Sequence, residues 1–362
     1  MILNMKNKVT REMKAPPAPL NPTALGALNS EDRAALEDLY IRGTPENTLR
    51  AYERDLIYIT AWKDLSFGET LSWPEREEVG LRFILDHSRD LGDEQSAARQ
   101  TAEALIEKGL RKTFNCPAPS TLDRRIASWR VFHRMRNLQS PFEAPLVRQA
   151  RSKARKAAAR PPAPKSAHPI TRDILEKLLE VSGSGLRGLR DRAVLLVGFA
   201  SGGRRRSEIV SLLREDIDLT NFETTGVVVL QLLSTKTTQK GETPKLVLKG
   251  RAARGLVAYL DAGEIKEGPV FRRITRSGKL GSKQLSSAAI SQIIKRLLIE
   301  AGFDPSFASP HGLRSGFLTQ AALDGAPIQA AMRLSLHRSV AQAQQYYDDV
   351  EITENPAADL LG

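Results

Sequence analysis

One stretch of the chain, from residue 144 to residue 172, carries Lys or Arg at eight positions (148, 151, 153, 155, 156, 160, 165 and 172) and no Asp or Glu. Four prolines interrupt its second half, at positions 161, 162, 164 and 169. Because proline lacks an N–H donor and restricts the residue before it, regular structure should stop near Ala159. We interpret residues 158–168 as an extended, basic linker between two domains, with a merely solubilising linker as the alternative. A chain of 362 residues is long enough for two hydrophobic cores.

The part before the linker reads as helical. Apolar residues recur at helical spacing in segments that begin at Ser30 and at Thr44-Pro45, and in segments 74–91, 96–108 and 120–138. These segments predict a helical bundle over residues 30–157. Residues 1–29 contain four prolines in a polar context, which is typical of a flexible arm.

Basic side chains dominate one face of the helix expected from Ser120 to Leu138, opposite a core face that contains Ile126 and Trp129. Nearly all charge on that face has one sign, which favours contact with a phosphate backbone over an ordinary solvated face. The candidate DNA-binding residues of this helix and the stretch after it are Arg124, Arg125, Arg130, Arg134, Arg148, Arg151, Lys153, Arg155 and Lys156.

The whole chain has a formal net charge of +12, which favours a polyanionic partner. Its 41% hydrophobic and 27% charged residues are those of a soluble globular protein. No run is long enough for a transmembrane helix, and the first residues lack the apolar core of a secretory signal. Cys116 is the only cysteine, so a disulfide or a thiolate metal cluster within the chain is excluded. We therefore expect a cytoplasmic protein that binds nucleic acid and no membrane.

The second domain, residues 169–350, is predicted to be mostly α-helical with a small antiparallel β-sheet. Helices are expected at 171–181, 190–201, 205–213, 250–262, 284–301, 310–324 and 327–335. The β-branched, alternating run within 217–234 and the segment Lys245 to Leu248 supply the sheet. Residues 351–362 are acidic and then apolar, and we interpret them as a tail that folds back or docks on a neighbouring protomer.

Four residues near the C-terminus stand in a suggestive order. His311 and Arg314 are three apart, so a helix would put both on one face. Tyr346 follows His337 by nine residues with no Gly or Pro between them, so a helix or helix-turn can join the two. Cations, imidazoles and a phenol that converge point to phosphate chemistry with a tyrosine nucleophile. Each fragment alone is more often ordinary packing.

Two upstream features complete the series. The segment from Gly203 to Leu212 holds an Arg-Ser-Glu cluster at a helix start, and an apparent hairpin carries Lys236. The order Arg, Lys, His-x-x-Arg, His, Tyr resembles the tyrosine recombinase (phage integrase) family, closely over residues 168–350 and more loosely over 30–155. The resemblance implies a two-domain DNA clamp, with a helical core-binding bundle and an integrase-like catalytic domain. It also implies that DNA is cut and rejoined through a 3′-phosphotyrosine, with strand exchange through a four-way junction in a homotetramer.

The resemblance assigns Arg205 and Arg314 to a phosphate clamp, for which the guanidinium fork is well suited. The family pattern Gly-x-Arg-x-Ser-Glu, aligned through Gly203, selects Arg205 over Arg204 and Arg206. Glu208 lies three residues on and is expected to orient Arg205.

The lysine of the hairpin is expected to be the general acid that protonates the 5′ oxygen. Lys236 is the candidate, and Lys240 remains a rival. His311 and His337 take the other two clamp positions, and His311 can also assist proton transfer.

The spacing in the family selects Tyr346 as the nucleophile over its neighbour Tyr347. Neighbours on a helix face about 100° apart, so only one of the two can reach the phosphate. One departure from the pattern precedes the second histidine, where Ser335-Leu336 replaces the usual Leu-Gly and removes a flexible glycine.

No metal or cofactor is expected, because no acid stands beside the two histidines at the spacing of a metal site. A type IB topoisomerase and a non-catalytic architectural DNA-binding protein are the alternatives, and a divalent-metal transposase is the least favoured. The target sequence, accessory proteins, and the choice among integration, excision, resolution and inversion stay open.

Overall fold

The structure, a computed structural model, describes residues 29–92, 95–158, 165–231, 244–337 and 339–351. The chain divides into two compact units, Met1–Pro162 and Ala163–Gly362. Within the described ranges, no helix is both long enough and apolar enough to cross a bilayer. The expected arm, most of the expected tail, and residues 159–164 of the expected linker lie outside these ranges.

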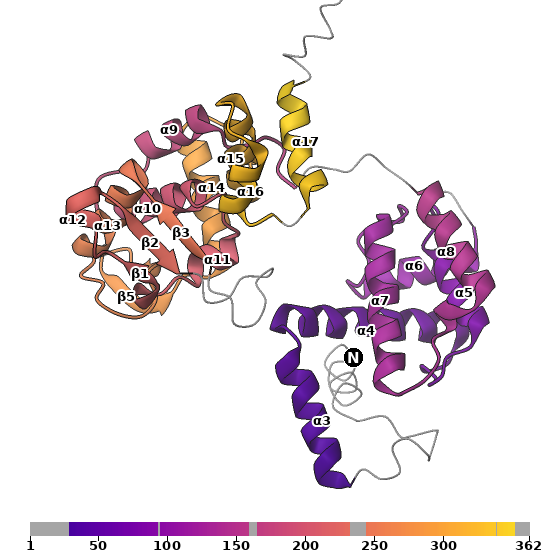
Figure 1. The fold of residues 1–362 in the computed structure, drawn as a ribbon. Helices are drawn as coiled ribbons and strands as arrows, with labels where there is room; N and C mark the ends of the chain where they lie inside the picture. The colour runs from indigo at the N-terminus through magenta and orange to yellow at the C-terminus, as the bar shows by residue number, and fades with distance from the viewer. Residues whose placement is uncertain (1–28, 93–94, 159–164, 232–243, 338, 352–362) are drawn as a thin grey trace, which may run out of the picture. The chain divides into compact units, whose positions relative to one another are not determined.

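The N-terminal unit is helical, as its apolar periodicity predicts (Figure 1). Its helices are α3 (Ser30–Gly43), α4 (Glu46–Phe67), α5 (Glu77–Asp86), α6 (Ala97–Glu107), α7 (Pro119–Met135) and α8 (Pro145–Ala157), with a 3-10 turn η1 (Pro141–Glu143). Trp62 of α4, Phe83 of α5 and Trp129 of α7 lie in one buried cluster. The end of α8 agrees with the stop expected near residue 159.

The helix α5 is much shorter than predicted. We expected a helix over residues 74–91, but α5 begins at Glu77 and ends at Asp86. The preceding residues form a loop because Glu75 is held there: its carboxylate accepts from the Lys63 ammonium (2.6 Å), and its backbone N–H donates to His133 Nε2 (3.2 Å).

In the C-terminal unit a small sheet lies beside a larger group of helices (Figure 1). The helices are α9 (Arg172–Glu180), α10 (Leu186–Ala200), α11 (Arg206–Val210), α12 (Phe222–Thr225), α13 (Gly250–Ala262), α14 (Ser287–Glu300), α15 (His311–Leu323), α16 (Ile328–Ser335) and α17 (Val340–Glu351). Strands β1 (Ile217–Asp218), β2 (Val228–Gln231) and β3 (Lys245–Leu248) form an antiparallel sheet in the order β1-β2-β3. The predicted fold class, mostly helical with a small antiparallel sheet, is confirmed.

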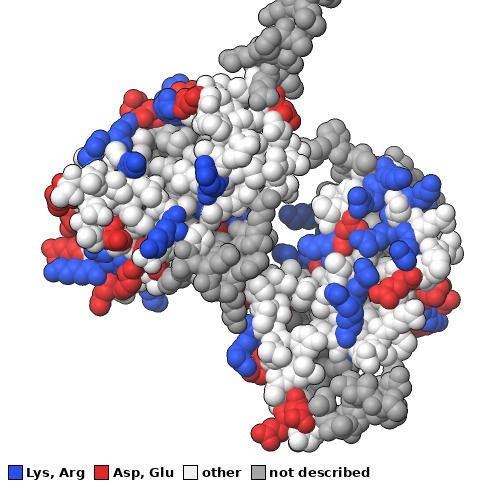
Figure 2. Space-filling model, in the orientation of Figure 1, with Lys and Arg blue, Asp and Glu red and all other residues white. Residues whose placement is uncertain are grey.

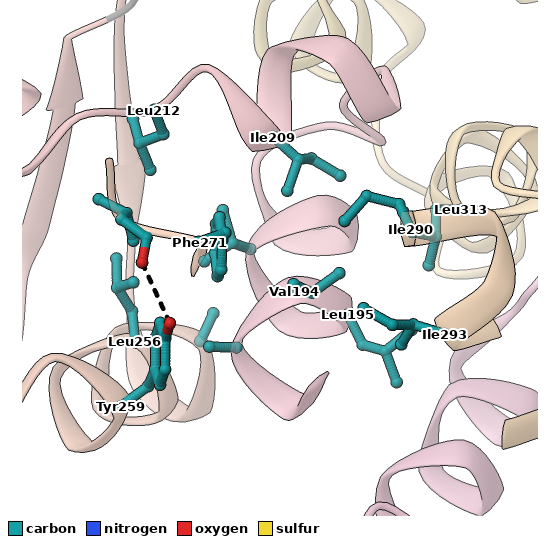
Figure 3. Close-up of a cluster of buried hydrophobic side chains, with 14 of the residues drawn as sticks. Val194, Leu195, Ile209, Leu212, Leu256, Tyr259, Phe271, Ile290, Ile293 and Leu313 are labelled. Carbon is teal, nitrogen blue, oxygen red and sulfur yellow. Dashed lines mark hydrogen bonds between the residues drawn. The ribbon is translucent and has the colours of Figure 1, made fainter. Parts of the chain in front are cut away.

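The apolar helix α10 lies at the centre of this unit. Figure 3 shows its residues Val194 and Leu195 among Leu256 of α13, Ile290 of α14 and Leu313 of α15. Each of these five side chains has 0% of its surface exposed. Because α10 is packed on several sides, the turn that follows it is fixed in position, and this turn begins the candidate site.

A second, two-stranded sheet was not predicted. Strands β4 (Arg272–Ile274) and β5 (Leu280–Gln284) pair antiparallel around a turn at Gly278, whose φ is +81°. Their side chains are largely exposed and polar, so the strands lack the apolar alternation from which strands are recognised. The helix expected from residue 284 therefore starts later, at Ser287, where the Ser286 hydroxyl accepts from Ala289 N–H.

Candidate active site

Two glycines bring three segments of the C-terminal unit into backbone contact. Gly202 and Gly203 follow α10 with φ of +94° and +70°. A Cβ on Gly203 would lie 2.3 Å from Cα of Arg314, and a Cβ on Gly202 would lie 2.4 Å from the carbonyl oxygen of Leu334. No side chain fits in either place, and both φ values favour glycine. The turn after α10, the helix α15 and the end of α16 are thereby held together.

Arg205 leaves this turn just before α11 and is held by Glu208. Its Nη1 donates to Glu208 Oε1 (2.7 Å), and its backbone N–H donates to Oε2 (3.3 Å). The Glu208 side chain is only 5% exposed, whereas that of Arg205 is 34% exposed. One edge of the guanidinium is therefore fixed by a buried carboxylate, and the rest of the fork remains accessible to an oxyanion.

Arg314 of α15 is buried and joins two other parts of the site. Its Nη1 donates to the carbonyl of Gly203 (3.1 Å), and its Nε donates to Nε2 of His337 (3.2 Å). Burial and the neighbouring Arg204 and Arg205 lower the pKa of Arg314 to about 10. Its charged form is therefore less favourable than in water, which an oxyanion would reverse.

His337 follows the end of α16 and is neutral at pH 7. Because Nε2 accepts from Arg314, the ring proton lies on Nδ1, which donates to the Ser335 hydroxyl (2.8 Å). Burial and the nearby guanidinium groups lower the pKa of His337 to about 4.

His311, the first residue of α15, lies beside Tyr346 of α17. The distance from His311 Nε2 to Tyr346 Oη is 3.4 Å. Burial, together with the charges of Lys165, Arg314 and Arg205, lowers the pKa of His311 to about 4. At pH 7 its imidazole is neutral, so Nε2 can accept the phenolic proton when the other nitrogen carries the ring hydrogen.

The neighbouring Tyr347 points elsewhere. Its side chain is buried, and its hydroxyl donates to the carbonyl of Ala326 (2.9 Å). Burial raises the pKa of Tyr347, which disfavours a phenolate there. Of the two tyrosines, Tyr346 is the one whose hydroxyl lies in the cluster.

The three consecutive arginines have different environments. Arg206 is exposed and donates to the Ser291 hydroxyl (2.9 Å). Arg204 has a side chain only 3% exposed, and its Nη2 donates to the carbonyl of Leu334 (2.9 Å). Sequence reasoning considered Arg204 only as a rival in the clamp. A further cation of the site, Lys165, was counted only as part of the linker.

The replacement of glycine before His337 leaves the turn intact. Leu336 ends α16 with φ of 53° and ψ of 41°, the left-handed conformation that glycine adopts readily. The departure therefore places a leucine in a strained backbone conformation before His337. Lys236 and its rival Lys240 lie outside the described residues.

Several candidate DNA-binding arginines of the N-terminal unit have partners within it. Arg124 is paired with the buried carboxylate of Asp55, and the Arg125 guanidinium lies over the Tyr58 ring, 3.3 Å from its centroid. Arg130 pairs with Glu143 (3.2 Å) and Arg151 with Asp123 (2.7 Å). The charges of Arg124, Arg130 and Arg151 are therefore partly compensated within the unit, and DNA contact by these four arginines stays a prediction.

The remaining candidates are exposed, and no ion pair joins them to another described residue: Arg134, Arg148, Lys153, Arg155 and Lys156. All but Arg134 lie on α8. Figure 2 shows Lys and Arg side chains gathered over the part of the unit where α8 lies. That these residues bind DNA stays a prediction. In the part of the chain that the structure describes, no group of three or more His, Cys, Asp or Glu is placed to hold a metal ion.

Comparison with known proteins decides the family. Residues 169–351, more than half of the chain, match the phage integrase family. The chain belongs to this family of tyrosine recombinases. An integrase/recombinase XerD homologue of Selenomonas ruminantium is 28% identical over 327 residues, covering 87% of this chain and 85% of the relative. The tyrosine recombinase XerD of Listeria innocua is 26% identical, covering 84% and 89%.

Solved structures share the fold at lower sequence identity. The integrase of transposon Tn1549, in complex with a circular intermediate DNA, is 16% identical with a TM-score of 0.53, covering 86% of this chain and 93% of that one. The recombinase XerH, bound to a palindromic difH substrate, is 15% identical with a TM-score of 0.51, covering 98% and 93%. The predicted two-domain recombinase fold and the enzyme class are therefore established.

Proposed function

We propose that this protein is a site-specific recombinase that cuts and rejoins duplex DNA through a covalent 3′-phosphotyrosine at Tyr346. The observation that carries the proposal is the contact between Tyr346 Oη and the neutral imidazole of His311, beside Arg205 and Arg314. Membership of the phage integrase family supports it.

The scissile phosphate is bound first. Arg205 offers the part of its fork that Glu208 leaves accessible, and Arg314 adds a second guanidinium. Two positive groups on the non-bridging oxygens stabilise the charge that builds up as phosphorus is attacked. His337 holds Arg314 through Nε2 and so positions it toward the phosphate.

Tyr346 then attacks. Its phenolic proton passes to Nε2 of His311 as the Oη–phosphorus bond forms in line with the leaving group. The bond from phosphorus to the 5′ oxygen breaks, and that oxygen takes a proton from a general acid, for which Lys236 is the candidate. The phosphotyrosine conserves the bond energy, so the reverse reaction with a 5′ hydroxyl rejoins a strand without a nucleotide cofactor.

The partner is double-stranded DNA carrying a specific recombination site. The solved relatives include recombinases bound to DNA, such as XerH on difH and the lambda integrase dimer on a COC′ core site. A homotetramer with strand exchange through a four-way junction follows from the family. In the proposed complex, residues 30–157 and 169–350 contact opposite sides of the duplex, with residues 158–168 between them and residues 351–362 docked on a neighbouring protomer.

Covalent capture tests the proposal. The full-length protein is incubated, in EDTA and without magnesium, with nicked duplex fragments tiled across the DNA that flanks its gene. A protein–DNA adduct that resists denaturant is expected with the wild type and with Tyr347→Phe, and no adduct with Tyr346→Phe. Loss of the adduct only in Tyr347→Phe would contradict the assignment of the nucleophile.

Two further outcomes separate the alternatives. Tight binding without an adduct on any fragment would indicate an architectural protein. A wild type that forms the adduct and relaxes supercoiled plasmid, but joins no strands between two differently labelled duplexes, would indicate a topoisomerase.

A further inference from the structure

The described end of the expected linker, residues 165–168, runs along the start of α15, where His311 lies. Ser309 N–H donates to the Ser166 hydroxyl (2.9 Å), and the Ser309 hydroxyl donates to the carbonyl of Lys165 (2.9 Å). The same Ser309 hydroxyl accepts from the N–H of His311 (3.2 Å). The backbone at Lys165 is therefore one hydrogen-bonded residue away from a candidate catalytic histidine.

Residues 165–170, which we name the strap, are fixed at their other end too. His168 N–H donates to the carbonyl of Phe307 (3.0 Å), and the two rings stack with centroids 4.5 Å apart. Ile170, which is fully buried, donates its N–H to the carbonyl of Gly312 (2.8 Å).

Glycines on α15 make room for the strap. A Cβ on Gly316 would lie 1.9 Å from the carbonyl oxygen of Ile170, and a Cβ on Gly312 would lie 2.9 Å from Oγ of Ser166. The strap is therefore packed directly against two successive turns of α15, the helix that begins with His311.

The strap places a cation at the site. The Lys165 side chain is exposed, and no described carboxylate pairs with it. Its charge acts on the His311 imidazole, since it lowers the pKa of that group together with Arg314 and Arg205. Glu208 is the one described carboxylate in ion-pair contact with the arginines of the cluster. The cluster therefore has an excess of positive charge that an oxyanion would compensate.

We propose that Lys165 is a further phosphate-binding residue of the active site, delivered by the strap, whose ammonium group contacts a non-bridging oxygen of the scissile phosphate. This inference rests on the proposed function. The strap, which includes the end of the expected linker, would then supply part of the phosphate-binding site. Within it, Ser166 is the residue that positions Lys165.

The test compares single-turnover rates of adduct formation on a nicked duplex that the wild type cleaves. Lys165→Ala is expected to be slower by about 10- to 100-fold, less than for a fully buried oxyanion donor because the ammonium is exposed. Lys165→Arg, which keeps the charge, should retain most of the rate. The matched control is Lys266→Ala, which removes an exposed lysine of the same unit that contacts none of the site residues and should react like the wild type.

A second substrate separates charge compensation from a structural role. The same duplex is made with an uncharged methylphosphonate at the scissile position. If Lys165 neutralises that phosphate, wild type and Lys165→Ala should react with the methylphosphonate at equal rates. A defect that persists on this substrate, or a Lys165→Ala rate equal to wild type on the normal phosphate, would overturn the inference. Absence of any wild-type adduct would instead overturn the proposed function.

Ser166→Ala tests the positioning part. It removes the hydroxyl that accepts from Ser309 and should slow the normal substrate by a smaller factor than Lys165→Ala. Combined with Lys165→Ala it should add little, because the two changes act through the same ammonium group. Additive losses would show that Ser166 acts independently of Lys165.

Discussion

The buried charges of the N-terminal unit are paired differently from those of the candidate site in the C-terminal unit. In the N-terminal unit, Lys63 and Glu75 are fully buried and lie 2.6 Å apart, and Asp55 is paired with Arg124 and accepts from Ser128. In the C-terminal site, one buried carboxylate, Glu208, contacts two guanidinium groups, while Arg314 has only a carbonyl and an imidazole as hydrogen-bond acceptors.

The difference separates a structural network from a binding site. The N-terminal pairs are complete within the folded chain, so they stabilise it only while both partners are present. The C-terminal cluster has more cations than described carboxylates, and burial together with Arg204 and Arg205 lowers the pKa of Arg314. We expect an oxyanion to compensate this charge.

The largest expected effect is on stability, from loss of the buried ion pair between Lys63 and Glu75. Lys63→Met would leave Glu75 buried without a counter-ion and should lower the free energy of unfolding by about 3–5 kcal/mol. Calorimetry of the full-length chain measures it. The double variant Lys63→Met with Glu75→Gln should recover a large part of the loss, because no unpaired charge remains. Equal losses in the single and double variants would contradict the assignment of this pair.

Removal of a cation from the incomplete cluster should affect chemistry and not folding. Arg205→Ala is expected to slow adduct formation by about 10²- to 10³-fold, the usual cost of removing one preorganised oxyanion donor. Its melting temperature should change little, because the buried Glu208 keeps Arg204 as a counter-ion (3.6 Å). Arg206→Ala is the matched control, since this neighbour is exposed and its guanidinium donates to the Ser291 hydroxyl, away from Glu208. A comparable loss of rate in Arg206→Ala would show that the chosen register is wrong.

An inorganic oxyanion should bind at the cluster around Arg205 and Arg314 and compensate its positive charge. Sulfate is expected to stabilise the C-terminal unit by about 1–3 kcal/mol at concentrations well above its dissociation constant. The melting temperature in sodium sulfate is compared with that in sodium chloride of equal ionic strength. Arg205→Ala controls for the general stabilising effect of sulfate and should lose the specific part. An equal shift in both proteins would mean that the site binds no oxyanion.

The comparison extends to the backbone. Asn137 in the N-terminal unit and Leu336 in the site both have positive φ, 51° and 53°. Asparagine tolerates this conformation, whereas leucine does not. Leu336→Gly should therefore be more stable than Leu336→Ala by about 1 kcal/mol, because both lose the same packing and only glycine removes the strain. Urea unfolding measures the difference, and equal stabilities would contradict the strain.

The smallest expected effect is that of mild acid on the rate. His311 must be neutral to accept the phenolic proton, and its pKa of about 4 reflects burial with Lys165, Arg314 and Arg205 around it. Activity should be retained above that value and lost as the pH falls through it, so kcat/KM should change less than about twofold between pH 7.5 and 5.5. A fall in kcat/KM with a midpoint near pH 6.5 would contradict the lowered pKa of His311.

Folding must be followed in the same experiment. The folded-state pKa values of His87, His311 and His337, about 3, 4 and 4, lie below the ordinary 6.5. Between 6.5 and these values the unfolded chain binds more protons, so the stability present above pH 6.5 decreases as the pH falls. Circular dichroism at each pH separates this loss from a loss of catalysis.

Much of the fold followed from local pattern. Apolar periodicity, capping residues and helix breakers located most of the helices, and β-branched alternation located β2 and β3. No separate helix was predicted for α8, and α12 lies within the run that was expected to be strand. The hairpin of β4 and β5 was missed because its exposed, polar strands lack that alternation. Such strands are fixed by their contacts with the rest of the unit, as when Gln284 Nε2 of β5 donates to the carbonyl of Val210 in α11.

For the candidate site, too, local pattern predicted the motifs but not the contacts between residues that are distant in sequence. Ordered motifs selected Arg205, Glu208, His311, Arg314, His337 and Tyr346, and the structure brings these six together. Partners far away in sequence were not predictable. From the sequence, Arg124 is a free cation on a helix face. In the structure it pairs with Asp55, which lies 69 residues earlier in the chain. From the sequence, Lys165 is one of the basic residues of the linker. In the structure, the strap brings it near His311.

The two glycines after α10 have a mechanical consequence. With no side chain between them, the turn at Gly202 and Gly203, the helix α15 and the end of α16 cannot slide past one another without losing backbone contact. The helix α17 is held to this assembly by side chains, among them Tyr347 against the carbonyl of Ala326. The proposed nucleophile, Tyr346, therefore lies on a helix that can move separately from the proposed phosphate-binding residues. Displacement of α17 alone would remove Tyr346 from the cluster and leave Arg205 and Arg314 in place.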